Sequence, residues 1–283
     1  MSELINKITD EQYEALDGIN FSKLKPFLDS PYLFKKSIEN PMDDDNAALK
    51  IGVAVHCLAL TPELFSDKFA VSVTCDRRTK EGKAAWEAFI TENAGKTVLS
   101  PQEFDVVANC FKAISHNKFF QHVFNFQDEV FFEAGGSTEI FGSKVKGRVD
   151  MFNKTKNFIV DIKTCSEIPN VDNIRKAIWK HKYHMQAFIY KAIVDNVFHT
   201  NAEFVFLFVD KKNFNSVGLA KVGSEFFNRA AMTLNETLCR YENCKANNIW
   251  PSLPNSDFPY IVDAFKDDFE DALDITLDDD DNA

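Results

Sequence analysis

The sequence predicts an α+β protein whose core is a central mixed β-sheet flanked by helices, with a helical region before it. Three observations lead to this class. Helical patterns fill the first part of the chain, strand-like segments separated by Gly- and Asn-rich turns cluster at residues 129–164, and helices then alternate with two more strands. This order is typical of one mixed sheet with helices packed on it. A sizeable core is expected, because 45% of the 283 residues are hydrophobic and 28 are Phe.

The N-terminal helices are predicted from their capping residues and breakers. They cover residues 20–40, as two short helices divided at Pro31, and residues 43–62, 77–95 and 100–117. Asn20 or Ser22 is the expected N-cap of the first helix. Ser100, followed three residues later by Glu103, has the pattern of a capping box. We therefore expect the last helix of this region to begin at that serine.

The sheet is predicted from runs of β-branched and aromatic residues. The expected strands cover residues 129–134, 138–142, 144–152 and 157–164, followed later by 202–210 and 216–222. Helices are expected at residues 170–180, 183–198 and 224–248. Gly135, Gly136 and Gly142 are expected to supply turns between the first strands.

These elements divide the chain into three parts. Residues 1–125 form a helical region, residues 126–262 form the sheet-containing core in one structural unit with that region, and residues 263–283 form an acidic tail that we expect to be disordered. The formal net charge of −11 alone argues against a nucleic-acid partner. Nine acidic residues follow Lys266, however, so the body carries a charge of only about −2 and has room for a basic groove.

The location of the protein is predicted to be cytoplasmic. No apolar run is long enough to span a bilayer, and the N-terminus lacks the basic and then apolar pattern of a signal peptide, so no membrane partner is expected. The six Cys are scattered, which favours reduced thiols over disulfides.

Charged residues lie within two of the predicted strands. Asp161 and Lys163 share one face of a strand with Ile159, and Asp150 lies on the preceding strand of the same hairpin, where it could approach Asp161. Burying such charges costs several kcal/mol unless each finds a partner. Two converging carboxylates suit a hard cation such as Mg²⁺, whose bound waters can attack phosphorus while a lysine stabilises the transition state. The alternative is an exposed hairpin with an ion pair worth at most about 1 kcal/mol.

Two further motifs accompany this set. Gln186 and Tyr190 lie one turn apart on the helix that follows the Asp-x-Lys strand, and Gly52 and His56 lie one turn apart on an apolar helix upstream. The Asp, Asp-x-Lys set resembles the signature of the PD-(D/E)XK nuclease superfamily. The Gln-x-x-x-Tyr and Gly-x-x-x-His motifs resemble those of its subgroup that contains RecB, the AddAB enzymes and phage-type exonucleases. The alternative is core packing for Tyr190 and His56 and an ordinary surface position for Gln186.

The resemblance extends over about residues 10–260. The segments "GINFSKLKPFLDSPYLFK", "GVAVHCLALTPELFSDKFAV", "RRTKEGKAAWEAF", "VKGRVDMF", "FIVDIKTCSE", "YHMQAFIY" and "WPSLP" follow the order of the RecE family, the exonuclease VIII type encoded by phages and prophages. The resemblance implies a processive exodeoxyribonuclease that degrades linear double-stranded DNA from 5′ to 3′ and leaves 3′ overhangs. It also implies a single-strand annealing recombinase as partner, a homo-oligomeric ring, and a bacterial host cell.

The resemblance assigns roles to individual residues. Asp150 and Asp161 would be metal ligands, Lys163 the catalytic lysine, and His56 an additional ligand. Glu129 takes the place of a further acidic ligand, with Glu133 as the competitor that the sequence does not exclude. The expected cofactor is Mg²⁺, with Mn²⁺ able to substitute. Relatives with the same two motifs often bind an iron–sulfur cluster through one upstream Cys and three clustered downstream. Only two Cys lie downstream of the helical pair here, so no cluster is predicted.

The residues expected to contact DNA are polar or basic. They are Gln186, Tyr190, Arg148, Thr164, Arg77 and Lys80, of which the last two belong to a basic cluster with Arg78 and Lys83. Solvated helix faces are the alternative for at least half of the basic residues. Two other functions remain open at this stage: a noncatalytic DNA-end-binding or inhibitor protein on the same scaffold, and a metal-independent interaction protein that works through its acidic tail.

Overall fold

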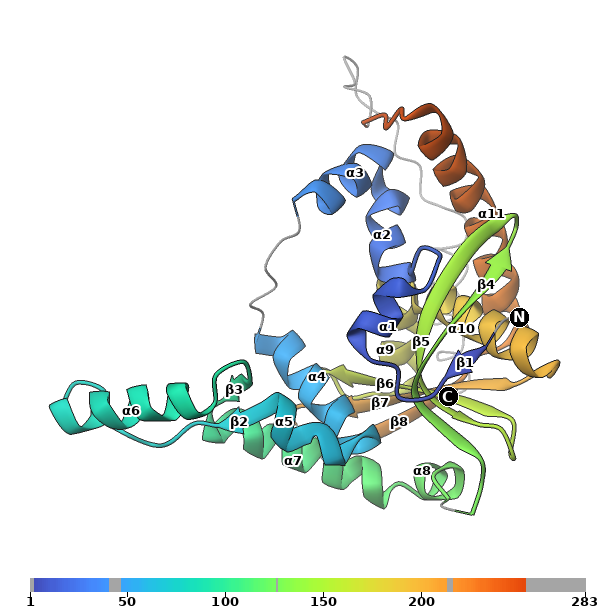
Figure 1. Cartoon of the computed structure of the whole chain (residues 1–283). Helices are drawn as coiled ribbons and strands as arrows, with labels where there is room; N and C mark the ends of the chain where they lie inside the picture. Colours follow the sequence, from blue (N-terminus) through green and yellow to red (C-terminus); the bar gives the residue numbers. More distant parts are fainter. Residues whose placement is uncertain (1–2, 41–46, 126, 213–215, 253–283) are drawn as a thin grey trace, which may run out of the picture.

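The computed structural model describes residues 3–40, 47–125, 127–212 and 216–252, so the acidic tail predicted at 263–283 lies outside the described residues. Within these ranges the chain folds around a six-stranded mixed sheet with the strand order β1-β4-β5-β6-β7-β8 (Figure 1). The strands are β1 (Leu4–Ile5), β4 (Val130–Ile140), β5 (Ser143–Asn153), β6 (Phe158–Cys165), β7 (Glu203–Asp210) and β8 (Val217–Lys221). The predicted α+β class with a central mixed sheet is confirmed.

One strand pair of this sheet is parallel. β6 and β7 run side by side in the same direction, and the neighbouring pairs are antiparallel. The connection between them contains α9 (Val171–Lys180) and α10 (Tyr183–Phe198), since a parallel pair needs a crossover. The carboxyl ends of β6 and β7 therefore meet at one edge of the sheet.

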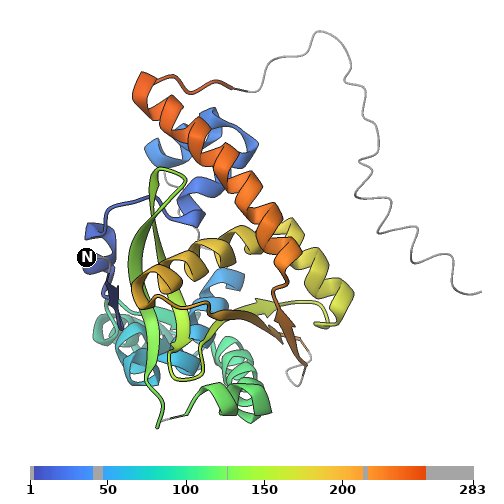
Figure 2. The same ribbon diagram turned by 90° about the vertical axis from the view of Figure 1, so that its right-hand side faces the viewer.

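Helices cover both faces of the sheet. α2 (Phe21–Asp29), α9, α10 and α11 (Ser224–Asn247) pack on one face, and α4 (Ala47–Leu60), α7 (Pro101–His116) and α8 (Lys118–Val123) on the other (Figure 2). β7 shows the alternation that separates the two layers. Phe204, Phe206 and Phe208 face the first layer, whereas Leu207 and Val209 face the second. Phe side chains contribute to the core on both faces of the sheet.

The remaining elements lie in the N-terminal region. They are α1 (Asp10–Ala15), α3 (Pro31–Glu39), the 3₁₀ turn η1 (Pro62–Leu64), α5 (Phe65–Lys68), β2 (Phe69–Val71), α6 (Lys80–Glu92) and β3 (Thr97–Leu99). The predicted capping box is present: the Ser100 hydroxyl accepts from the Glu103 N–H, and the Glu103 carboxylate accepts from the Ser100 N–H.

This region is not purely helical, contrary to the prediction. β2 and β3 form a small parallel pair, and β1 joins the edge of the main sheet beside β4. The segment from β2 to β3, which contains α6, forms an arm that projects away from the sheet (Figure 1). Strands of two or three residues are stabilised by tertiary contacts, so sequence patterns do not reveal them.

A second correction concerns β4. Gly135 and Gly136 were expected in a turn between two strands, but β4 runs through both of them without a break. A Cβ added to Gly135 would lie 2.5 Å from Cδ1 of Ile8, and one added to Gly136 would lie 2.8 Å from Cγ2 of Ile193. These glycines therefore make room for the N-terminal segment on one side and α10 on the other. In the described part of the chain, no helix is long and apolar enough to cross a membrane.

Candidate active site

The site begins where β5 and β6 separate. Their backbone pairing runs from Asn153 opposite Phe158 to Met151 opposite Val160. At the next position a side chain takes the place of the backbone partner: Asp150 Oδ2 accepts the N–H of Ile162 at 2.8 Å. The diverging strands leave space between them, and this space contains the charged residues that the sequence places within strands.

Three side chains with metal-binding atoms meet there. One ligand atom each of His56, Glu133 and Asp150 lies within 4.8 Å of the others, and His56 Nδ1 is 3.3 Å from Asp150 Oδ2. The three residues come from α4, β4 and β5. Gly52, one turn before His56, faces Thr164 of β6, where an added Cβ would lie 3.4 Å from the threonine hydroxyl. α4 thus packs closely on β6 at this position, which brings His56 to the carboxylates.

The backbone of Glu133 is unusual. Its φ of +42° lies in the left-handed region, and the β4–β5 ladder pairs Phe132 with Met151 and Ala134 with Val149 but omits Glu133. Such a conformation costs about 1–2 kcal/mol in a non-glycine residue. Strain that persists inside a regular strand often marks a functional position. Here it lies directly beside Asp150.

The carboxylates of Glu133 and Asp150 are partly and largely buried, respectively. Burial, and then the nearby charge of Asp150, raises the pKa of Glu133, while burial also raises the pKa of Asp150 against the opposing charge of Lys163. Burial lowers the pKa of His56 to about 4, so its imidazole is neutral at neutral pH and can act as a metal ligand. A bound cation would stabilise the ionised form of these neighbouring carboxylates, whose pKa values are raised without it.

Asp161 lies next to this group and is paired with Lys163. Its Oδ2 is 2.6 Å from Nζ of the lysine, and the other buried oxygen, Oδ1, has no hydrogen-bond partner among the described residues. Burial raises the pKa of Asp161 to about 6, and the charge of Asp150 adds to this effect while Lys163 opposes it. A buried carboxylate oxygen without a donor fits a metal ion as its missing partner. The donor set is therefore compatible with the expected cation.

Lys163 is held by contacts from α10. Its Nζ donates to Gln186 Oε1 at 3.0 Å and lies 4.6 Å above the ring of Tyr183, and Gln186 Nε2 donates to the Tyr190 hydroxyl at 2.8 Å. Burial would lower the pKa of Lys163, but Asp161 and Asp150 outweigh it and raise the pKa. The lysine is therefore charged at neutral pH.

Gln186 and Tyr190 support Lys163, and their contact with DNA stays a prediction. Gln186 is hydrogen-bonded to both Lys163 and Tyr190. The Tyr190 ring packs against Gly147, where an added Cβ would lie 2.8 Å from the ring carbons. Both residues thus position the lysine.

The prediction of Glu129 as a ligand is also corrected, in favour of Glu133. Glu129 lies before the first residue of β4, is largely exposed, and pairs with Lys154 at 2.9 Å. It precedes Glu133 by four positions, which corresponds to about 13 Å along an extended chain. Its carboxylate is therefore outside the metal-binding group.

The basic residues are only partly brought together. Arg148 is half-buried near Glu133, where its Nη2 donates to Asp10 Oδ1 at 2.8 Å and its guanidinium lies 4.6 Å from the Tyr13 ring centre. Arg77 and Lys80 lie instead on the exposed arm, away from the carboxylates, and Arg77 stacks on Trp86 of α6 (Figure 1). Neither residue therefore belongs to the group around the carboxylates, and their predicted contact with DNA stays a prediction.

Lys146, on β5, is a structural residue. Its ammonium is buried and donates to the backbone carbonyls of Tyr13, Glu14 and Leu16, at the C-terminus of α1. These contacts and the Arg148–Asp10 bond hold the N-terminal segment against β5. Tyr183 was not among the predicted site residues, although its aromatic side chain on the helix that faces Lys163 was an available signal.

The fold and the site define a protein of the PD-(D/E)XK nuclease fold, in which carboxylates and a lysine meet where two strands of a mixed sheet separate. Residues 20–256 match the family model described as "PDDEXK-like domain of unknown function (DUF3799)", and the chain belongs to this family.

Comparisons with solved structures support the fold. A proposed exonuclease from Eubacterium rectale superposes with a TM-score of 0.61 at 15% sequence identity, covering 96% of this chain and 99% of its own. The structure of SSO0001 is 13% identical, covers 77% of this chain and 85% of its own, and with a TM-score of 0.30 supports no conclusion. No curated protein matches the sequence.

Proposed function

We propose that the protein is a metal-dependent exodeoxyribonuclease that degrades linear double-stranded DNA. The observation that carries the proposal is the convergence of His56, Glu133 and Asp150 beside the Asp161–Lys163 pair. A protein that only binds DNA ends does not need buried carboxylates whose ionisation is costly. This argument favours hydrolysis over the noncatalytic alternative.

The metal ion would be held by His56, Glu133 and Asp150, with Asp161 contributing the oxygen that lacks a donor. A set dominated by carboxylate oxygens with one imidazole suits Mg²⁺ or Mn²⁺. When bound, such an ion supplies an activated water and polarises the phosphoryl oxygens.

Lys163 would act on the scissile phosphate. Its positive charge can neutralise the charge that develops on the phosphoryl oxygens in the transition state. Asp161 and Gln186 fix the direction of the ammonium, and Tyr190 fixes Gln186 in turn. Because a side chain with four rotatable bonds loses less entropy in the transition state when it is already held, these contacts favour catalysis.

Further parts of the proposal derive from the RecE-like sequence motifs. We infer digestion of one strand from 5′ to 3′, release of 3′ overhangs, and cooperation with a single-strand annealing protein in phage-type homologous recombination. A ring-shaped homo-oligomer would keep the enzyme on its DNA. The mass of the protein in solution, measured by light scattering, tests the oligomer: a monomer contradicts it.

The main experiment uses blunt linear duplex labelled at either the 5′ or the 3′ end. Early release of the 5′ label with Mg²⁺, but not with EDTA or with Asp161→Asn, supports the proposal. Glu129→Gln is a matched control, because this exposed carboxylate lies outside the metal-binding group. No release from either end by the folded protein refutes hydrolysis, and early release of the 3′ label refutes the polarity.

A further inference from the structure

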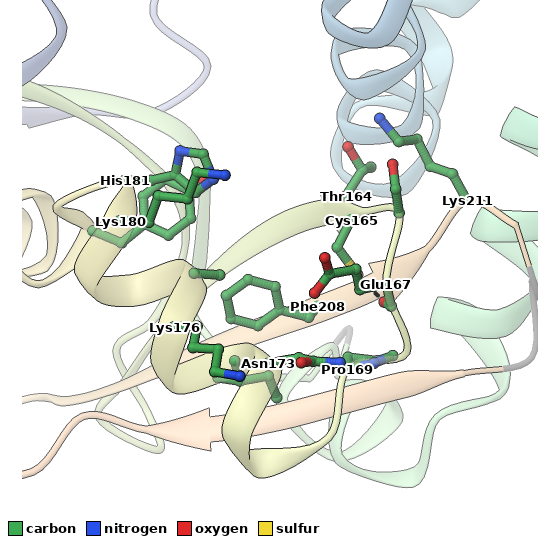
Figure 3. A pocket seen from close by; sticks show the side chains of 14 residues that line it. Thr164, Cys165, Glu167, Pro169, Asn173, Lys176, Lys180, His181, Phe208 and Lys211 are labelled. Atoms are coloured by element: carbon green, nitrogen blue, oxygen red, sulfur yellow. Dashed lines mark hydrogen bonds between the residues drawn. The ribbon is translucent and has the colours of Figure 1, made fainter. Parts of the chain in front are cut away.

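A pocket of about 450 Å³ lies beside Lys163, at the edge where the carboxyl ends of β6 and β7 meet. Figure 3 shows this pocket between the end of β6, α9 and β7, with Thr164, Cys165, Lys176, Lys180, Phe208 and Lys211 among its lining residues. Crevices at the carboxyl ends of parallel strands are frequent ligand sites in sheets covered by helices. The volume suits a small molecule and excludes a DNA duplex.

The pocket adjoins the candidate active site directly. Thr164 follows Lys163 on β6, and Tyr183 forms part of the wall while its ring lies 4.6 Å from Nζ of the same lysine. Tyr183 thus contacts both the pocket and the lysine. The pocket is therefore the immediate neighbour of the position proposed for the scissile phosphate.

Part of the lining is apolar and aromatic. Phe208 lies near the centre of the pocket in Figure 3. Tyr183, Ile174, Pro169 and Ala177 also line the pocket. The rings of Tyr183 and Phe208 are 6.4 Å apart and inclined by 50°. Aromatic side chains of this kind provide surfaces on which nucleobases stack, and they do so without sequence preference.

The charged part of the lining is mostly basic. It contains Lys176, Lys180 and Lys211 against one carboxylate, that of Glu167. Within the described ranges, none of these three lysines forms an ion pair. Three ammonium groups without partners at one small pocket favour an anionic ligand.

The surroundings of His181 support this electrostatic assignment. Burial lowers the pKa of its imidazole, and the charges of Lys25, Lys180 and Lys163 lower it further. Lys25 comes from α2, so positive charge reaches the rim of the pocket from a further element. The catalytic lysine belongs to the same positive field.

We propose that this pocket binds the terminal nucleotide of the strand under digestion, with its phosphate beside Lys176 and Lys180 and its base against Tyr183 and Phe208. The inference rests on the proposed exonuclease function and deepens it. Room for one nucleotide beyond the scissile bond specifies a nucleoside monophosphate as the product. Hydrolysis breaks one P–O bond, and water supplies the hydroxyl group for phosphorus and the proton for the leaving oxygen, so no other reactant is needed.

The binding test is independent of nuclease activity. The probes are dAMP, deoxyadenosine and inorganic phosphate, titrated calorimetrically into the full chain in EDTA. We expect dAMP to bind about tenfold or more tightly than either deoxyadenosine or phosphate, because both the charged and the aromatic contacts contribute. Equal affinity for dAMP and either fragment, or no binding of dAMP, overturns the proposal.

Two variants of α9 provide a matched comparison. Lys180→Gln removes a charge from the pocket, and Arg175→Gln removes one from the same helix at an exposed position that does not line it. We expect Lys180→Gln to weaken dAMP binding about tenfold and Arg175→Gln to leave it within about twofold. Because both side chains are exposed, both variants should fold, which thermal melting verifies. Equal effects of the two variants refute the pocket assignment.

The outcome also separates this inference from the proposed function. Intact dAMP binding without any nuclease activity would refute hydrolysis and retain the pocket. Mg²⁺-dependent digestion by a protein whose dAMP binding fails the tests above would retain hydrolysis and refute the pocket. Product length gives a further readout: wild-type digestion should release mononucleotides, and release of dinucleotides or longer fragments as the main product contradicts the proposal.

Discussion

Replacing Asp161 by Asn removes a negative charge that the folded protein holds away from water, beside Lys163. In the metal-free protein, burial raises the pKa of Asp161 from 3.8 to about 6, with a further contribution from Asp150 and an opposing one from Lys163. A carboxyl group with a higher pKa in the folded state binds its proton more tightly there. The ionised group therefore lowers the free energy of unfolding at pH values above about 6, and this cost disappears below about pH 4.

The size of the effect follows from the pKa shift. One pKa unit corresponds to about 1.36 kcal/mol, so the shift of Asp161 costs the folded protein about 3 kcal/mol at pH 8 and about 1 kcal/mol at pH 4.5. Asn is uncharged and nearly isosteric, so Asp161→Asn should regain this free energy. For a chain of this length, about 3 kcal/mol corresponds to a rise of roughly 6–12 °C in Tm.

The assay is thermal unfolding in EDTA at pH 8 and at pH 4.5, with Asp105→Asn as the control. Asp105 is an exposed residue of α7, and its replacement should change stability by less than about 0.5 kcal/mol. The gain from Asp161→Asn should shrink at the lower pH. Saturating Mg²⁺ or Mn²⁺ should stabilise the wild type by about 2–3 kcal/mol at a concentration of roughly 100 Kd, and the variant by less. A loss of stability at pH 8, or a gain that does not depend on pH, would refute the reasoning.

Three other perturbations follow from the site and its supports. Glu133→Gln should reduce nuclease activity and weaken Mn²⁺ binding, measured by calorimetry, by about 100-fold or more. Glu129→Gln should leave both unchanged. If only Glu129→Gln had these effects, Glu129 would be the metal ligand. Gly147→Ala places a Cβ 2.8 Å from the Tyr190 ring and should cost about 1–3 kcal/mol in urea unfolding, so unchanged stability would contradict this packing. Lys146→Met removes the donor to three carbonyls at the C-terminus of α1. It should lower the free energy of unfolding by about 1–3 kcal/mol and speed amide hydrogen exchange in α1. Unaltered exchange would exclude the capping role.

The sequence predicted much of the site because spacing determines which residues share a face. Asp161 and Lys163 are two residues apart on a strand, and their side chains do meet. The one-turn spacing of Gln186 and Tyr190 likewise led to a pair that is bonded in the structure. Local periodicity therefore accounts for contacts within an element.

Contacts between elements were less predictable. The choice between Glu129 and Glu133 depended on the register of β4 against β5, which places Glu133 beside Asp150. Strand propensity indicates neither this register nor the left-handed backbone of Glu133. The location of Arg77 depended on how the arm leaves the main body, which no local pattern encodes. Gly135 and Gly136 were predicted in a turn because adjacent glycines often mark one. Their actual role, making room for Ile8 and α10, depends on tertiary packing that the local sequence does not show.

The N-terminal segment has a consequence for the solution behaviour of the protein. The family match begins at residue 20, whereas β1 and α1 precede it and contact β4 and β5. In a protein shortened to the matched region, the stretch of β4 from Phe132 to Gly136 would lose its partners in the N-terminal segment, and its outward backbone groups would be free to pair with another chain. Such a protein would keep every residue of the candidate site and yet expose a longer unpaired edge of the sheet. The N-terminal segment thus covers this part of the edge.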